Sequence, residues 1–182
     1  MDKTQNIALF GGSFDPPHIG HIKIINTLIK IKDIDKVIVM PTFLNPFKSK
    51  SHASAKLRLQ WLKKIFQNSK QIEVSDYEIL QNKKVPTIQT VEHLLHKYNK
   101  IYLVIGADNL KSLDKWYKYE ELKNKVSFIV ATRDALDIPK SFIKLDIDEN
   151  ISSSQLRKEM KISKLPNICA DEIYEFYARI SI

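Results

Sequence analysis

Hydrophobic and polar positions along the chain follow two alternating patterns. Short runs of consecutive apolar residues, such as Ile7-Ala8-Leu9-Phe10, are typical of strands buried on both faces. Longer stretches between them carry apolar residues at helical spacing. The apolar runs predict strands at 7–10, 37–40, 72–74, 101–105, 126–130 and 143–145. The amphipathic stretches predict helices at 22–31, 54–66, 87–98, 113–122, 152–160 and 171–179, and they leave 75–86 as a connection.

The alternation of strands and helices predicts an α/β protein. Strands that are apolar throughout indicate a parallel sheet with helices on both faces. Polar stretches follow three of the strands, at 11–21, 41–48 and 106–108. Such sheets bind ligands beyond the carboxyl ends of their strands, at the switch in strand order, so we expect the functional site there. No internal repeat or shift in composition divides the chain, and residues 1–182 are predicted to form a single domain.

Composition narrows the class of protein only in part. Cys169 is the one cysteine in 182 residues, which excludes a disulfide framework and a multi-cysteine zinc site and fits a reducing cytoplasm. The N-terminus shows no signal peptide, and no apolar run is long enough to span a bilayer. The net charge of +8 suits anionic ligands, but the lysines are spread along the chain, so charge alone identifies no partner.

The densest set of candidate functional residues lies between the first strand and the first helix. Residues 11–21 read Gly-Gly-Ser-Phe-Asp-Pro-Pro-His-Ile-Gly-His. The glycine pair lets the backbone turn sharply and lets a ligand approach it closely, while the two prolines stiffen the loop. His18 and His21 are three residues apart at the helix start, so both imidazoles can point the same way. Because a helix N-terminus presents unpaired N–H groups, this stretch is predicted to bind a polyphosphate.

A second candidate anion site opens the helix predicted at 152–160. Ser152 followed three residues later by Gln155 has the capping-box pattern, which needs no function beyond starting a helix. A helix N-terminus with hydroxyl groups, and with Arg157 one turn in, can also hold phosphates. The residues alone leave both interpretations open.

Both stretches resemble motifs of one enzyme superfamily. His18-Ile19-Gly20-His21 is similar to the (H/T)-x-G-H signature of the nucleotidyltransferases, and residues 11–21 as a whole resemble the bacterial nicotinate-nucleotide adenylyltransferases. Residues 151–157 resemble the Ile-Ser-Ser-Thr-x-x-Arg motif of that family, with Ser154 in place of Thr. The resemblance implies a Rossmann-like doubly wound parallel sheet flanked by helices. It also implies adenylyl transfer from ATP to nicotinate mononucleotide, giving deamido-NAD and pyrophosphate in NAD biosynthesis.

The family's reaction is a direct in-line transfer without a covalent intermediate, because the attacking phosphate is already an anion. The resemblance implies that His18 and His21 are catalytic and stabilise charge on the α-phosphate and the leaving pyrophosphate. Mg2+ is expected to arrive with ATP, since nothing resembles a protein-built magnesium cage. The residues implied in ATP binding are Gly11, Gly12, Ser13, Phe14, His18, Gly20, His21, Gly106, Asp108, Ile151, Ser152, Ser153, Ser154 and Arg157.

Shorter matches imply the acceptor site. Lys48 resembles the lysine of a family loop, with Phe47 in place of His, and the alternative is a solvated lysine. Thr87 lies where the family recognises the nicotinate carboxylate, with Pro86 in place of Tyr. Trp116 is implied to stack on the pyridine ring, although a tryptophan on a helix is more often part of the core. The full set implied for the acceptor is Asp15, Lys48, Thr87, Trp116 and Arg133, the last as the partner of the mononucleotide phosphate.

Other functions stay open at this point. Within the superfamily, the acceptor could instead be nicotinamide mononucleotide or pantetheine phosphate. The (H/T)-x-G-H position occupied by His18, and the segment around Trp116, argue against pantetheine phosphate. From a different class, the chain could be a non-catalytic nucleotide- or RNA-binding protein on the same fold, but both motifs are intact. The expected partners are therefore ATP and nicotinate mononucleotide, with no membrane and no nucleic acid, and the oligomeric state is left open.

Overall fold

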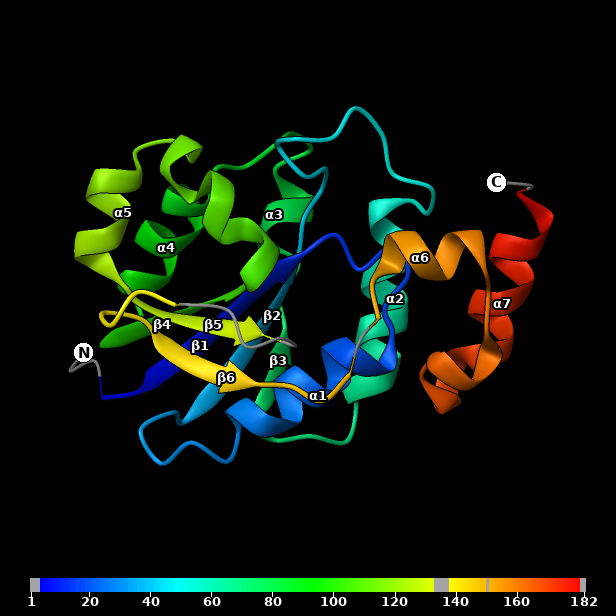
Figure 1. Cartoon of the computed structure of the whole chain (residues 1–182), viewed down its shortest axis with the longest axis horizontal. Coiled ribbons are helices and arrows are strands. Elements are labelled where there is room, and N and C mark those ends of the chain that lie inside the picture. The colour runs from blue at the N-terminus through cyan, green and yellow to red at the C-terminus, as the bar shows by residue number, and fades with distance from the viewer. Residues whose placement is uncertain (1–3, 133–137, 150, 181–182) are drawn as a thin grey trace.

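The computed structural model of the protein describes residues 4–132, 138–149 and 151–180. Its centre is a six-stranded parallel sheet with the order β3-β2-β1-β4-β5-β6 (Figure 1). The order reverses between β1 and β4, which is the arrangement of a doubly wound, Rossmann-like sheet. The strands are β1 (Asn6–Gly12), β2 (Lys36–Pro41), β3 (Ile72–Val74), β4 (Lys100–Gly106), β5 (Ser127–Thr132) and β6 (Ile143–Asp146).

Helices cover both faces of this sheet, as the sequence predicts. The α-helices are α1 (Ile19–Leu28), α2 (Ala55–Phe66), α3 (Tyr77–Leu80), α4 (Thr87–Leu95), α5 (Tyr119–Lys125), α6 (Ser153–Lys158) and α7 (Ala170–Arg179). Three 3-10 helices are η1 (Ala107–Lys115), η2 (Ile162–Lys164) and η3 (Asn167–Cys169).

Alternation along β1 explains how the two layers form. Ala8 and Phe10 point to the face covered by α1 and α2, whereas Ile7 and Leu9 point to the face covered by α4 and α5. Successive side chains of a strand point to opposite faces, so an apolar run contributes to both layers. The continuous apolar runs of the sequence are therefore buried on both faces.

A third apolar cluster lies on the side of α2 away from the sheet. Trp61 of α2 packs there with Leu156 of α6 and with Ile173 and Tyr177 of α7. Figure 1 shows α6 and α7 beyond α2, next to the loop that connects β1 to α1. This packing places the second sequence motif beside the first.

Two predicted elements differ from the structure. The helix predicted at 113–122 is divided into η1 and α5, because Trp116 adopts an extended conformation that ends η1 and Lys118, directly before α5, adopts a left-handed one (φ 55°). The connection predicted at 75–86 contains the short helix α3. Within the described residues, no helix is both long enough and apolar enough to cross a membrane.

Candidate active site

The loops that follow β1 and β4 separate at the centre of the sheet. The chain leaves β1 into α1, whose Ile25 packs on one face, and it leaves β4 into η1, whose Leu113 packs on the other. A crevice at such a switch point is where doubly wound sheets bind their ligands. Of the predicted site residues at the ends of these two strands, Gly11, Gly12 and Gly106 line a cavity at this crevice.

The β1–α1 loop turns at Phe14 rather than at a glycine. Phe14 has a positive φ of 48°, and none of the described glycines has a positive φ. The expectation that Gly11 and Gly12 make the turn is wrong, because both belong to β1. Gly12 instead provides space, since a Cβ there would lie 3.2 Å from the Phe14 ring. The buried Phe14 ring lies edge-on to His21, with 4.9 Å between ring centroids, and this packing holds the strained backbone.

His18 and His21 stand together at the start of α1. Their rings stack with centroids 3.7 Å apart, and His18 is only 2% exposed. The backbone N–H of His18 donates a hydrogen bond of 3.2 Å to Nδ1 of His21. Because Nδ1 of His21 accepts, the neutral ring carries its proton on Nε2 and presents a donor at that end.

Gly20 gives the His18 ring its position. A Cβ at Gly20 would lie 3.0 Å from Nδ1 and 3.1 Å from Cε1 of His18. Any larger residue would therefore push against the ring that stacks on His21. The glycine of the His-x-Gly-His motif is thus explained by the packing of the first histidine.

The second motif docks directly onto the first. Ser152 caps α6 by accepting from the backbone N–H of Gln155 at 3.2 Å, as the capping-box pattern predicts. Oγ of Ser153 donates to the backbone carbonyl of Pro16 at 2.9 Å, and the Arg157 guanidinium donates to the backbone carbonyl of Asp15. The N-terminus of α6 therefore lies beside the loop that leads into α1.

The Asp15 carboxylate connects three parts of the chain. It accepts hydrogen bonds from the backbone N–H groups of His52 and Ala53, each at 2.9 Å, and from the hydroxyl of Tyr177 in α7. Burial opposes the charge, but these hydrogen bonds outweigh burial and hold the pKa of Asp15 below its usual value. The resemblance implies that Asp15 binds the acceptor. In the structure the residue is 2% exposed, its carboxylate is bonded to the protein, and it is also among the residues that line an open hollow beside this loop.

Arg58 of α2 binds the backbone of the loops around this site and was not among the predicted site residues. Its side chain is fully buried and donates to the backbone carbonyls of Ser13, Thr42, Phe43 and Ala53. One guanidinium thus fixes the loops after β1 and after β2 relative to each other.

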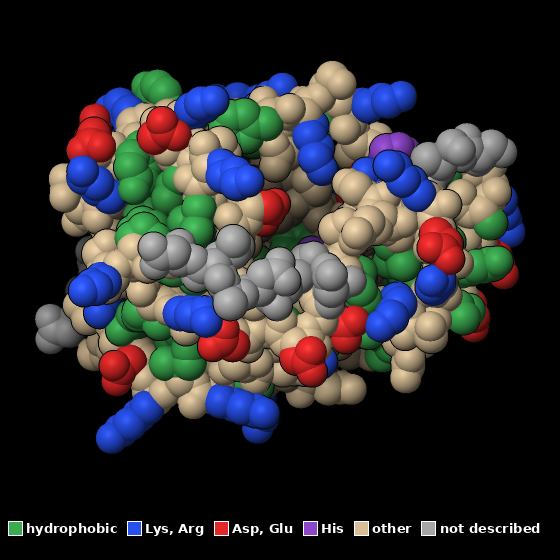
Figure 2. Space-filling view, in the orientation of Figure 1, with side chains coloured by type: hydrophobic (Ala, Val, Ile, Leu, Met, Phe, Trp, Pro, Cys, Tyr) green, Lys and Arg blue, Asp and Glu red, His purple; other side chains and the backbone are tan. Residues whose placement is uncertain are grey.

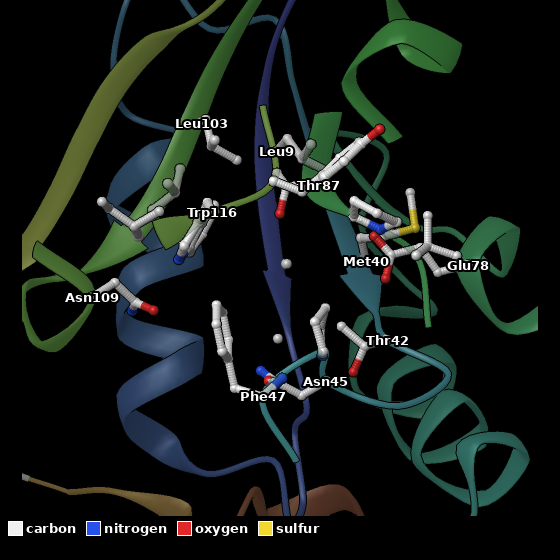
Figure 3. Close-up of a pocket in the computed structure, with 18 of the residues that line it drawn as sticks. Leu9, Met40, Thr42, Asn45, Phe47, Glu78, Thr87, Leu103, Asn109 and Trp116 are labelled. Carbon is white, nitrogen blue, oxygen red and sulfur yellow. Dashed lines mark hydrogen bonds between the residues drawn. The ribbon is translucent and has the colours of Figure 1, made fainter. Parts of the chain in front are cut away.

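A cavity of about 180 Å3, which we call the central cavity, lies between the carboxyl ends of β1, β2 and β4. It is lined mainly by apolar side chains and by glycine backbone. Figure 3 shows Trp116 and Asn109 on one side and Met40 and Glu78 on the other, with Thr87 between them. The cavity brings together five of the predicted site residues, namely Gly11, Gly12, Thr87, Gly106 and Trp116.

A second, open hollow of about 340 Å3 adjoins the β1–α1 loop and is basic. Lys48, Lys50, His52 and Arg157 line it together with Asp15, the one acidic residue of the described lining, and Nζ of Lys48 lies 3.5 Å from Oγ of Ser13. Phe47 borders both this basic hollow and the central cavity. Elsewhere lysine and arginine side chains are spread over the surface rather than gathered in one patch, as Figure 2 shows for one face.

Three other predicted residues either line neither cavity or lie outside the described part of the chain. Asp108 is exposed and is not among the residues that line the central cavity, but its neighbour Asn109 is. Ile151 is buried at 7% exposure ahead of α6. Arg133 lies outside the described residues. No group of three or more His, Cys, Asp and Glu side chains able to hold a metal ion occurs in the described part of the chain.

Sequence reasoning missed Glu78, the acidic residue in the wall of the central cavity. Its side chain is 6% exposed, and Oε1 accepts from the Thr90 hydroxyl at 2.6 Å. Glu78 lies in the stretch that was predicted to be a plain connection, and a single glutamate there carries no signal. Its position in the cavity wall becomes apparent only in the folded structure, where it contacts Thr90 of α4.

The doubly wound sheet, with two helix N-termini and two histidines at its switch point, is that of a nucleotidyltransferase. A family model described as cytidylyltransferase-like matches residues 9–159. The chain belongs to this family and, within it, to the nicotinate-nucleotide adenylyltransferases.

Two relatives support that placement. The chain is 64% identical over 173 residues to a probable nicotinate-nucleotide adenylyltransferase of Sulfurimonas denitrificans, and the match covers 95% of both chains. It is 44% identical to the same kind of protein from Campylobacter fetus, over 95% of this chain and 97% of the relative.

A solved structure has the same fold. The nicotinic acid mononucleotide adenylyltransferase of Plasmodium falciparum, complexed with NaAD, matches with a TM-score of 0.79. The match covers 96% of this chain and 98% of that one at 24% sequence identity.

Proposed function

We propose that the protein transfers the adenylyl group of ATP to nicotinate mononucleotide, giving deamido-NAD and pyrophosphate in NAD biosynthesis. One observation carries the proposal: the two motifs dock onto each other, through Ser153 and Arg157, beside a mainly apolar cavity. A phosphate site and a ring site in contact are what this reaction needs. The names of the relatives agree with it.

The protein's part in the reaction is positioning and charge stabilisation. A phosphate oxygen of the acceptor attacks the α-phosphorus of ATP, the new P–O bond forms in line, and the bond to pyrophosphate breaks. The Nε2–H group of His21 donates a hydrogen bond to the oxygens on which charge develops. His18 stacks on His21 and keeps its ring oriented, with a centroid separation of 3.7 Å.

The triphosphate is proposed to lie between the starts of α1 and α6. The loop after β1 supplies backbone N–H donors near Ser13, the start of α6 supplies them near Ser154, and Arg157 adds a fixed positive charge. Arg157 and Lys48 both line the basic hollow, which gives the β- and γ-phosphates a favourable surrounding. Mg2+ enters as part of the MgATP substrate.

The pyridine ring of the acceptor is proposed to occupy the central cavity. Trp116 offers a flat apolar wall for stacking, and Thr87 lies at the start of α4, where backbone N–H groups suit a carboxylate. Arg133 stays the proposed partner of the mononucleotide phosphate. For Asp15 we now propose a positioning role, because its carboxylate accepts hydrogen bonds from the backbone of residues 52 and 53 and from Tyr177.

We further propose that residues 1–182 act as one nucleotidyltransferase domain in the cytoplasm, where ATP is supplied. The support for a single domain is that one family model spans residues 9–159 and that the Sulfurimonas relative is matched over 95% of its own length.

The proposal is tested by pyrophosphate release with MgATP and three acceptors in parallel. Turnover is expected with nicotinate mononucleotide. Equal turnover with nicotinamide mononucleotide would keep the reaction but reject an acid-selective ring site. Turnover with pantetheine phosphate alone, or no turnover with any acceptor, would contradict the proposal. Salt-sensitive RNA binding without turnover would favour a nucleic-acid-binding protein instead.

A further inference from the structure

Glu78 is the one acidic side chain among the described residues that line the central cavity. It projects from α3, and Figure 3 shows its carboxyl group beside Met40, on the wall opposite Trp116. The residue is 6% exposed. The Oγ1 hydroxyl of Thr90 in α4 donates a hydrogen bond of 2.6 Å to Oε1 of Glu78. A carboxyl group so placed is costly to keep charged.

The surroundings of Glu78 offer little to offset a negative charge. Burial raises the pKa of Glu78 to about 7, and the hydrogen bond from Thr90 opposes that rise only in part. No charged side chain of the described residues contributes to this shift. The nearest titratable neighbours along the chain have other partners, because Tyr77 stacks on His93 of α4 and Asp76 pairs with Lys63 of α2. Strand β2 presents the apolar Met40.

The two possible pyridine acceptors differ in the charge of the group on the ring, and a nearby carboxyl group such as that of Glu78 responds to this charge. The nicotinate ring carries a carboxylate and the nicotinamide ring a neutral amide. An anionic ring and an ionised Glu78 in one small apolar cavity repel each other, because the interior screens charge poorly. A protonated Glu78 removes that repulsion, whereas an ionised Glu78 can accept a hydrogen bond from an amide N–H.

We propose that Glu78 determines acceptor specificity through its protonation state: a ring carboxylate binds together with one proton taken up by Glu78 from solvent, and a neutral ring amide binds without it. The inference deepens the proposed function and rests on the pyridine ring occupying the central cavity. It assigns to Glu78 a part in selecting the acceptor and none in the transfer itself.

The test is a comparison of acceptor affinities across pH. Dissociation constants for nicotinate and nicotinamide mononucleotide are measured by calorimetry from pH 5.5 to 9, with α,β-methylene-ATP filling the nucleotide site. The ratio of the two constants removes the ionisation of the shared phosphate and of the histidines. We expect the ratio of the dissociation constant for the acid to that for the amide to be constant at low pH. Above pH 7 this ratio should rise, by up to about tenfold per pH unit. Calorimetry in two buffers should also record more protons taken up with the acid than with the amide above pH 7.

Two variants and one control make the result specific. Glu78→Gln keeps an acceptor for Thr90 and should give a ratio that does not change with pH. Thr90→Val removes the hydroxyl that stabilises the ionised form of Glu78, so the pH at which the ratio begins to rise should be higher than in the wild type. This variant tests the proposal even if Glu78→Gln fails to fold. Glu92→Gln, at an exposed position of α4, should behave like the wild type.

The contradicting outcomes are distinct. If both acceptors bind and the wild-type ratio is flat, or if Glu78→Gln keeps the wild-type slope, Glu78 does not select the acceptor and the proposed function stands. If neither mononucleotide binds at any pH, the proposed function and this inference are both overturned.

Discussion

His21 shows how one backbone contact prepares a side chain for chemistry. The amide of His18 occupies Nδ1 of His21, so the neutral ring carries its proton on Nε2. The edge-on Phe14 ring and the stacked His18 ring restrict its orientation. A donor held in this way costs little reorganisation when charge develops on the transferred phosphate.

Replacing His21 with Ala should therefore lower kcat by about a hundredfold to a thousandfold, while the affinity for ATP changes much less. The reason is that the Nε2 contact strengthens in the transition state. Single-turnover rates and calorimetric ATP binding measure the two quantities. His96→Ala, at an exposed position, is the matched control and should be unchanged. A variant whose ATP affinity falls as much as its rate would make His21 a binding residue only.

Glu78 also makes stability depend on pH. Its pKa is raised from 4.5 to about 7 in the folded protein, so the folded state holds a proton that the unfolded state has released. The resulting stabilisation is complete below the unfolded pKa and is lost as the pH rises through the folded pKa. Urea unfolding should show that the wild type loses about 3 kcal/mol relative to Glu78→Gln between pH 4.5 and 8. If the unfolding free energies of the two proteins change with pH in parallel, Glu78 is already ionised in the folded state over this pH range.

At the scale of elements, the start of α1 combines good helix geometry with a packing constraint. Gly20 sits in the first turn of this helix, with a conformation that alanine can adopt. Alanine favours helix by about 1 kcal/mol over glycine. Its Cβ, however, would press on the His18 ring at 3.0 Å.

Gly20→Ala should consequently leave the unfolding free energy within about 1 kcal/mol of the wild type and yet reduce kcat by about tenfold to a hundredfold. Thermal melts and initial rates are to be measured on the same preparation. A fully active variant would show that the position of His18 is not critical.

The last helix acts on the site through one hydrogen bond. Tyr177 of α7 donates to the Asp15 carboxylate inside the β1–α1 loop, 162 residues away in sequence. The bond helps to keep the pKa of Asp15 low, so its stabilisation is present above the usual Asp pKa and is lost as the pH falls through the lowered value.

Tyr177→Phe should cost about 1.5–3 kcal/mol of stability at neutral pH, because a buried carboxylate loses a donor, and the difference from wild type should shrink in acid. Chemical denaturation at pH 7 and pH 3 checks both statements. Tyr174→Phe is the matched control, since Tyr174 is 41% exposed and lies on the same helix. Equal losses for the two variants would remove the special role of Tyr177.

At the scale of the whole molecule, the sequence predicts most of what depends on local pattern. The strands and the parallel sheet follow from the apolar runs, whereas the meeting of residues 11–21 with 151–157 is implied by the family resemblance of the two motifs. The break at Lys118 could not be predicted, because no glycine or proline marks it. Arg58, Tyr177 and Glu78 were not assigned to the site because their contacts with Ser13, Asp15 and the cavity form only in the folded chain.

The central claim is that this site joins AMP to nicotinate mononucleotide. The most direct measurement follows ATP with a radioactive α-phosphate, incubated with Mg2+, the acceptor and the protein, and identifies the labelled product. The account predicts label in deamido-NAD at the rate of pyrophosphate release, with the rate falling sharply in His21→Ala. Label that stays in ATP, or that appears only as AMP, would contradict it.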